Sequence, residues 1–173
     1  MKSALFLDRD GVINEDDGYT HVWNDNILIP EVVNLIKRFK KSGKEIIIIT
    51  NQSGIGRGFY SDAVFHEFMK KMQERLKHFG AQIDKFYYCG CNPLFSSCPN
   101  RKPMPGLFKK AASENNIKLN SSIMVGDKLS DLLAAHRAGI PALYLFDKNN
   151  LASIEQNAGF KYTVVSSMKE ITG

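Results

Sequence analysis

The chain has 173 residues, of which 43% are hydrophobic and 24% are charged. This length and composition fit one domain, residues 1–173, with a buried core, and they exclude fibrous, mucin-like and low-complexity proteins. The net charge of +5 suggests an anionic partner, which could be nucleic acid, acidic lipid or a phosphorylated small molecule. No apolar run approaches the ~18 residues of a membrane span, and the N-terminus is no signal peptide, so we expect a cytoplasmic protein.

Short apolar runs alternate with amphipathic stretches along the whole chain. The expected strands are residues 4–7, 45–50, 83–88, 122–125 and 142–146. Helical spacing of apolar residues predicts helices over 32–39, 64–79, 107–114 and 129–138. Strict alternation of strand and helix predicts an α/β fold, a three-layer sandwich with a central parallel sheet and helices on both faces. In such folds the functional site lies beyond the carboxyl ends of the strands.

Three aspartates come directly after two of these strands. Asp8 and Asp10 follow the first strand, and Asp127 follows the strand at 122–125. Carboxylates brought together at one sheet edge repel each other, and a divalent cation with oxygen ligands, most simply Mg²⁺, relieves that repulsion. A single aspartate at such a place can instead cap a turn or a helix, but three of them favour a magnesium site.

A polar loop follows the most hydrophobic strand. Its residues Thr50, Asn51, Gln52 and Ser53 offer hydroxyl, amide and backbone groups that can bind a phosphate, although a plain polar loop has the same composition. The glycines of TNQSGIGRG do not match a dinucleotide fingerprint, because Phe59 stands where the third glycine is needed. The chain also contains no P-loop pattern, so nucleotide binding is disfavoured.

The segment 89–105 is long for a simple connection and carries all three cysteines and four of the six prolines. We expect it to be functional or braced by a metal. Near its end, Arg101 and Lys102 can bind phosphate groups, the arginine through its planar fork and the lysine as one fixed charge. A solvated basic pair is the alternative, and the neighbouring prolines argue against it because they restrict the backbone.

Four motifs at strand ends resemble the haloacid dehalogenase superfamily of phosphatases: DRDG, TN, a lysine in the third region and GDKLSD. The longer strings DRDGVIN, DDGYTH, TNQSGIGRG, RKPMPG and MVGDKLSD are similar to one branch, the D-glycero-D-manno-heptose 1,7-bisphosphate phosphatases, which are close to the histidinol-phosphate phosphatases. The resemblance runs from residue 4 to residue 138. It implies the fold of that superfamily, and the short chain leaves no room for a large cap domain.

This resemblance implies a role for each motif. Asp8 would attack phosphorus and form an aspartyl-phosphate, and Asp10 would act first as general acid and then as general base. Mg²⁺ would be held by Asp8, by the Asp10 carbonyl and by Asp127. Thr50 and Lys102 would stabilise the phosphoryl group during transfer, and Asp131 would orient Lys102 or a metal-bound water. Further residues implied to contact substrate are Asp16, Asp17, Gly18, Tyr19, Asn51, Gln52, Ser53, Arg101 and Lys128. For a second phosphate of the substrate, our candidates are Arg57 and Arg101.

Relatives in this branch usually bind a structural zinc in the segment 89–105, through a CxH pair and a CxC pair. Here Cys91 stands in place of the histidine and Asn100 in place of the last cysteine. The cysteines of this chain are Cys89, Cys91 and Cys98. Three thiolates can hold Zn²⁺ if water, another chain, His66 or His78 supplies a fourth ligand. A vestigial loop with free thiols is the alternative.

The function expected from these motifs is a Mg²⁺-dependent phosphomonoesterase that removes the 7-phosphate from heptose 1,7-bisphosphate in heptose-nucleotide biosynthesis, a route that can feed lipopolysaccharide. Two alternatives remain open: a histidinol-phosphate or other sugar-phosphate phosphatase, and a phosphate-binding protein on the same fold. A nucleic-acid module is disfavoured because aromatic residues do not interleave with a basic patch. The expected partner is a small phosphorylated sugar, with no nucleic acid and no membrane, and we expect a monomer.

Overall fold

The computed structural model describes residues 1–94, 97–149 and 158–173. Within these ranges six strands form one sheet, in which every neighbouring pair is parallel. The strands are β1 (Ala4–Leu7), β2 (Glu45–Asn51), β3 (Lys85–Cys89), β4 (Ile123–Gly126), β5 (Ala142–Phe146) and β6 (Thr163–Val165). Their order across the sheet is β3-β2-β1-β4-β5-β6.

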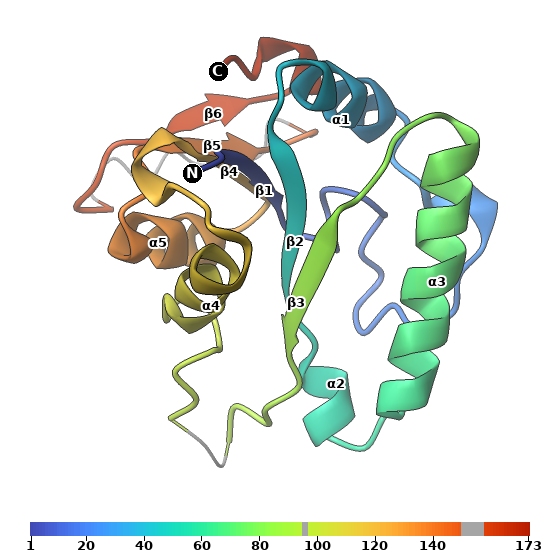
Figure 1. Ribbon diagram of the computed structural model, residues 1–173. Coiled ribbons are helices and arrows are strands. Elements are labelled where there is room, and N and C mark those ends of the chain that lie inside the picture. Colours follow the sequence, from blue (N-terminus) through green and yellow to red (C-terminus); the bar gives the residue numbers. More distant parts are fainter. Residues whose placement is uncertain (95–96, 150–157) are drawn as a thin grey trace.

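Helices cover both faces of this sheet (Figure 1). They are α1 (Glu31–Lys41), α2 (Ser53–Gly56), α3 (Asp62–His78), α4 (Gly106–Asn115) and α5 (Leu129–Ala138), with short 3-10 turns at Asp25–Ile27, Leu119–Ser121 and Met168–Glu170. Apolar side chains of α1 and α3 pack in one core cluster, and those of α4 and α5 pack in a second. The molecule is therefore the three-layer α/β sandwich that the sequence predicts.

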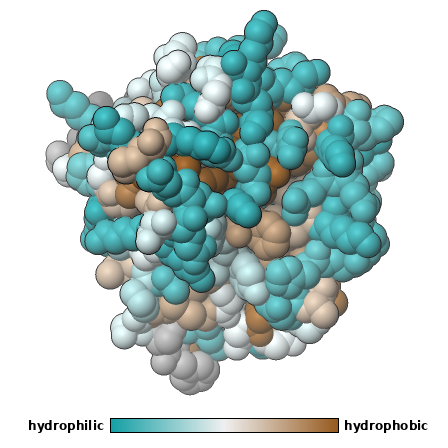
Figure 2. Space-filling view, in the orientation of Figure 1, coloured by the Kyte–Doolittle hydropathy of each residue, from teal (hydrophilic) through white to brown (hydrophobic). Residues whose placement is uncertain are grey.

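The central strands β1, β2 and β4 consist mainly of apolar residues because both of their faces are buried. In β2, Ile46 and Ile48 belong to the core beneath α1 and α3, whereas Ile47 and Ile49 belong to the core beneath α4 and α5. All four are fully buried. Side chains alternate between the two faces of a strand, so a strand covered on both sides needs a continuous apolar run. On the face shown in Figure 2, most of the surface is hydrophilic and hydrophobic side chains form separate patches.

The strand order reverses between β1 and β4. The chain runs from β1 outward through β2 to β3, then returns to place β4 on the other side of β1. At such a switch point the connections leave in opposite directions and open a crevice at the carboxyl ends of the strands. The backbone N–H of Asp8 donates to the Val125 carbonyl at 3.0 Å. This hydrogen bond holds the start of the loop after β1 against β4.

All five strands expected from the sequence form, with small shifts of their ends. The strand expected from residue 83 begins at Lys85, although Ile83 is buried. The strand β6 was not predicted, because its three residues make no apolar run long enough to signal a strand. A short helix, α2, lies where a plain loop was expected. In the described part of the chain no cap domain interrupts the sheet, and no helix there is long and apolar enough to cross a bilayer.

Candidate active site

Three carboxylates meet at the switch point. Asp8 follows β1, Asp127 follows β4, and Asp131 lies in the first turn of α5; one oxygen of each lies within 4.8 Å of the others. Gly11 makes this approach possible, since its φ is +81° and a Cβ atom there would lie 2.4 Å from Asp127 Oδ2. The glycine of the DRDG string thus leaves room for Asp127.

Lys102 is the cation of this carboxylate cluster. Its side chain is 2% exposed, and its Nζ lies 2.8 Å from Asp8 Oδ1 and 2.6 Å from Asp131 Oδ1. It also donates to the Ile49 carbonyl at 2.8 Å, so all three N–H groups have acceptors. These carboxylates raise the pKa of Lys102 to about 12 against the opposing effect of burial. One lysine therefore offsets only part of the charge of three aspartates.

Burial and the remaining negative charge raise the pKa values of Asp127 and Asp131. Burial, followed by the charges of Asp8 and Asp131, raises the pKa of Asp127 to about 8. Burial and Asp8 likewise raise the pKa of Asp131. Asp127 Oδ1 is buried without a hydrogen-bond partner. A buried, unpartnered carboxylate oxygen beside two further carboxylates is the donor set that a hard divalent cation prefers.

Asp10 belongs to a different cluster of side chains. Its Oδ1 accepts from Arg9 and from Asn14 Nδ2, and its Oδ2 accepts from Arg9 and from Gln52 Nε2. Arg9 is 1% exposed, and its guanidinium lies 4.3 Å from the centre of the Phe68 ring. Burial raises the pKa of Asp10, and the charge of Arg9 works in the opposite direction. The two aspartates of the DRDG string therefore point into different surroundings, although they are two residues apart.

Polar residues at the end of β2 and directly after it contact both the Lys102 segment and the Asp10 side chain. Asn51 exchanges two hydrogen bonds with the backbone of Lys102, each at 3.1 Å, and thereby ties β2 to the segment that carries this lysine. Gln52 Nε2 donates to Thr50 Oγ1 at 2.9 Å as well as to Asp10. In Figure 1, α2 and the segment between β3 and α4 both lie at the end of the sheet to which β2 and β3 lead.

An ion pair between Asp16 and Lys128 connects the loop after β1 to the other side of the site. Asp16 Oδ2 lies 3.2 Å from Lys128 Nζ, and Asp127 Oδ2 lies 3.6 Å from the same nitrogen. Tyr19 adopts a left-handed backbone conformation, with φ of 57°, and its ring lies edge-on against Phe59, with 4.7 Å between the ring centres. The loop is thus anchored by charge at one end and by aromatic packing further along.

These groups line a cavity of about 230 Å³. The predicted residues in its lining are Asp8, Asp10, Asp16, Tyr19, Asn51, Gln52, Ser53, Arg101, Lys102 and Lys128. The other predicted residues, absent from the lining, are Asp17, Gly18, Thr50, Arg57 and Asp127. Asp131, which the GDKLSD string had placed near Lys102, also lines the cavity, and so does Tyr60, to which no motif had assigned a role. Arg9 and Asn14 lie inside the DRDGVIN string but had been given no role, since only their hydrogen bonds to Asp10 connect them with the site.

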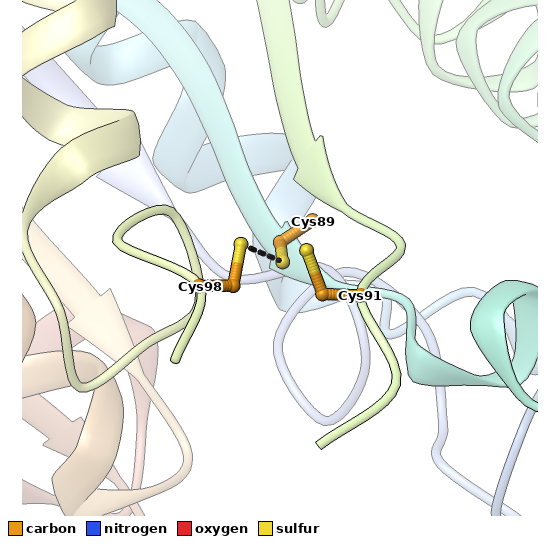
Figure 3. Close-up of side chains that lie close together, drawn as sticks. All are labelled: Cys89, Cys91 and Cys98. Carbon is orange, nitrogen blue, oxygen red and sulfur yellow. Dashed lines mark hydrogen bonds between the residues drawn. The ribbon is translucent and has the colours of Figure 1, made fainter. Parts of the chain in front are cut away.

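The three cysteines form a third cluster, in which the sulfur atoms lie close together (Figure 3). The Sγ atoms of Cys89 and Cys98 are 3.4 Å apart, and that of Cys91 lies within 4.8 Å of both. The pKa of Cys98 is lowered: burial opposes this shift, but hydrogen bonds from the Cys91 thiol and from backbone N–H groups outweigh burial. Cys98 is thus a stronger acid than an ordinary cysteine.

The two histidines expected as possible fourth ligands do not join the cysteine cluster. Among the described residues, no histidine, aspartate or glutamate lies within 4.8 Å of all three sulfurs. His66 lies on α3 beside Asp62 and Tyr88 instead, at 3.3 Å from each. His78 lies at the end of the same helix, with its ring against Phe79. Of the fourth ligands considered from the sequence, His66 and His78 are therefore not supported, because their places on α3 set them against Asp62, Tyr88 and Phe79.

The carboxylate cluster lies at the switch point of a doubly wound parallel sheet. Comparison with known proteins shows which class of protein has this arrangement. A family model of haloacid dehalogenase-like hydrolases matches residues 3–139. The chain therefore belongs to the haloacid dehalogenase-like hydrolase family, as the motifs at its strand ends had indicated.

Within this family the chain is similar to several heptose bisphosphate phosphatases. It is 42% identical over 153 residues to the D-glycero-beta-D-manno-heptose-1,7-bisphosphate 7-phosphatase of Helicobacter pylori, covering 88% of this chain and 84% of the relative. It is 35% identical over 176 residues to the protein of the same name from Vibrio cholerae, covering 98% and 94%. The crystal structure of D,D-heptose 1,7-bisphosphate phosphatase from B. bronchiseptica, complexed with magnesium and phosphate, superimposes with a TM-score of 0.80 at 29% identity, covering 97% and 94%.

Proposed function

We propose that this protein is a phosphatase that removes the 7-phosphate from D-glycero-D-manno-heptose 1,7-bisphosphate. The observation that carries the proposal is the buried cluster of Asp8, Asp127, Asp131 and Lys102 at the switch point. The substrate follows from relatives of that name, which match the chain over most of its length. The catalytic roles of Asp8 and Asp10, the Mg²⁺ site and the substrate contacts are parts of this proposal.

Asp8 is the nucleophile. Its Oδ1 accepts hydrogen bonds from Lys102 and from the Arg9 backbone N–H, whereas in the described part of the chain its Oδ2 accepts none. Lone pairs on Oδ2 therefore remain available. Attack on phosphorus forms an aspartyl-phosphate and divides the hydrolysis into two easier steps. Asp10 donates a proton to the departing sugar oxygen and then accepts one from the attacking water, a role that suits a carboxyl whose pKa is raised by burial.

The carboxylate cluster is proposed to hold Mg²⁺. Asp127 Oδ1 is the buried oxygen without a partner, and oxygens of Asp8 and Asp131 lie within 4.8 Å of an Asp127 oxygen. When bound, Mg²⁺ supplies positive charge that reduces the repulsion between the nucleophile and the phosphate. The ligands expected from the sequence are the Asp8 and Asp127 carboxylates and the Asp10 backbone carbonyl, and Asp131 is a third carboxylate near the first two. The side-chain carboxylate of Asp10 is not part of this cluster.

Substrate recognition is assigned to the loops that line the cavity. Arg101 lines the cavity, and its Nη1 is buried without a hydrogen-bond partner. An unpartnered guanidinium N–H beside a phosphate-binding site is suited to donate a hydrogen bond to a phosphate oxygen. Arg101 is therefore the better candidate for the second phosphate, since Arg57 does not line the cavity.

A panel of phosphate esters tests the proposed substrate. We expect kcat/KM for heptose 1,7-bisphosphate to exceed that for histidinol phosphate and for other sugar phosphates, since discrimination between substrates is expressed in this ratio. EDTA is expected to abolish the activity, and added Mg²⁺ to restore it. A higher kcat/KM for histidinol phosphate would refute the assigned substrate, and binding of every ester without turnover would favour a phosphate-binding protein.

The effect of Mg²⁺ on stability is expected to depend on pH. The folded, metal-free protein keeps a proton on Asp127 up to its raised pKa of about 8, whereas an unfolded aspartate loses it near its ordinary pKa of 3.8. The metal-free protein is therefore stabilised at low pH, and that stability is lost as the pH rises through 8. Because Mg²⁺ binds the deprotonated carboxylate, it competes with this proton below pH 8.

Thermal unfolding measures this competition. At one Mg²⁺ concentration, the rise in Tm should be larger near pH 8, the pKa of Asp127, than about two pH units lower. Magnesium-free buffer with EDTA provides the reference at each pH. An equal rise at both pH values would contradict the raised pKa of Asp127.

We further propose that Cys89, Cys91 and Cys98 bind Zn²⁺, with water or a group from another chain as the fourth ligand. The convergence of three sulfurs supports this, because structural zinc sites are tetrahedral and thiolate-rich. We expect elemental analysis of protein purified without chelator to find one zinc per chain. Replacing Cys91 with serine should lower the zinc content. Protein that contains no zinc and keeps three titratable thiols would instead support the vestigial loop.

A further inference from the structure

Tyr60 lies beside the active site in a fixed position. It is 8% exposed, and its ring stacks on His21, with 5.0 Å between the ring centres and 10° between the planes. Gly54 also borders the ring, because a Cβ atom there would lie 2.2 Å from Tyr60 Cε1. The missing side chain at Gly54 lets the tyrosine lie against the backbone of α2, so the direction of the hydroxyl is set by packing.

The hydroxyl of Tyr60 connects to Asp10 through a single amide. Tyr60 donates to Gln52 Oε1 at 2.6 Å, and Gln52 Nε2 donates to Asp10 Oδ2 at 3.0 Å. The second N–H of this amide donates to Thr50 Oγ1 at 2.9 Å. Gln52 is 2% exposed, and both ends of its amide are engaged. The amide thus turns its nitrogen toward Asp10 and Thr50 and its oxygen toward Tyr60.

We propose that Tyr60 is a positioning residue: through the Gln52 amide it holds the Asp10 carboxyl where that group serves the leaving oxygen. The proposal rests on the proposed function, in which Asp10 is the general acid. Without the hydroxyl, Gln52 Oε1 is buried with no donor, and the amide turns away to find one. Among the described residues, Asp10 Oδ2 is then held by Arg9 alone.

Loss of this positioning has a kinetic signature that depends on the leaving group. A sugar alkoxide is a poor leaving group and needs a proton from Asp10, whereas p-nitrophenolate departs without one. The ratio kcat/KM covers the steps up to departure of the leaving group, so the later role of Asp10 as a base does not enter. A defect in Asp10 positioning therefore lowers kcat/KM for the sugar phosphate and spares p-nitrophenyl phosphate. A general structural defect lowers both.

The test compares wild-type protein with Tyr60→Phe on the two esters. We expect kcat/KM for the sugar phosphate to fall by about tenfold, the effect of losing one buried hydrogen bond. For p-nitrophenyl phosphate we expect a change within roughly twofold. Asp10→Asn serves as the reference and should show the same selectivity with a larger loss. Tyr144→Phe is the matched control: it removes a hydroxyl that donates to the Thr172 carbonyl at 2.9 Å and should leave both reactions unchanged.

A double variant tests whether the effect passes through the amide. In a Gln52→Leu background, Tyr60→Phe should cause no further loss, because the connection to Asp10 is already broken. Equal losses on both esters, no loss on the sugar phosphate, or additive losses in the double variant would each overturn the positioning role. The sugar phosphate used is the one that the wild-type protein hydrolyses fastest. Preference for a different sugar phosphate would therefore refute the assigned substrate without affecting this comparison.

Discussion

Replacing Asp8 with asparagine is expected to abolish turnover while the protein remains folded. The amide is a far weaker nucleophile than the carboxylate, so no aspartyl-phosphate forms, and kcat should fall by roughly 10⁴-fold or more. Folding should not suffer, because the substitution removes one of three mutually repelling carboxylates and leaves Lys102 bound to Asp131 and to the Ile49 carbonyl. Steady-state hydrolysis of heptose 1,7-bisphosphate and thermal unfolding measure the two effects.

The control for Asp8→Asn is Asp62→Asn, which changes an exposed aspartate on α3, away from the cavity lining. It should retain wild-type kcat. In the absence of Mg²⁺, Asp8→Asn should be at least as stable as the wild-type protein, because like charges in a buried site are destabilising. Substantial turnover by Asp8→Asn would exclude Asp8 as the nucleophile. Loss of folding would instead mean that the Asp8 carboxylate is needed to hold Lys102.

Lys102→Met is expected to lower both activity and stability. It removes the cation that lies 2.8 Å from Asp8 and 2.6 Å from Asp131. Loss of one preorganised positive group beside the phosphate should reduce kcat by about 10²–10³-fold. Breaking a buried ion pair leaves charge without a partner, and the free energy of unfolding should fall by about 3 kcal/mol. Denaturant unfolding and steady-state kinetics report the two losses separately.

The stability loss in Lys102→Met should shrink as the pH falls. Burial already raises the pKa values of Asp127 and Asp131, and without the lysine these groups bind protons still more readily. Protonation removes the uncompensated charge, so the difference from wild type is largest above pH 8 and smaller in acid. Lys109→Met, on the exposed face of α4, is the matched control. A loss of stability that is independent of pH would point to packing rather than charge.

Much of the carboxylate cluster could be predicted from the sequence because its geometry follows from the strands. Asp8 and Asp127 each follow an apolar run, and the ends of neighbouring parallel strands must lie together. The register of β1 with β4 brings them to the same edge. Lys102 was harder to place, because it comes at the end of an irregular segment without periodicity. Its position depends on long-range contacts, such as the two hydrogen bonds from Asn51 to its backbone.

Other features left no signal that could be recognised in the sequence. Tyr60 follows Arg57, Gly58 and Phe59 in a glycine-rich stretch, and only the space beside Gly54 and the ring of His21 bring it to Gln52. The strand β6 consists of three residues, too few for a periodic pattern. The histidines of α3 were reasonable zinc ligands by residue type, yet the helix directs them elsewhere.

The sequence by itself determined the alternation of strands and helices, the family and the placement of the acidic motifs at strand ends. These properties are local: apolar runs and adjacent letters specify them without knowledge of distant contacts. Only the tertiary structure decided that Asp131 joins Asp8 and Asp127, that Asp10 belongs with Arg9, Asn14 and Gln52, and that the cysteines converge without a histidine. Hydrogen bonds and burial between segments far apart in the chain set those groupings, so no local pattern encodes them.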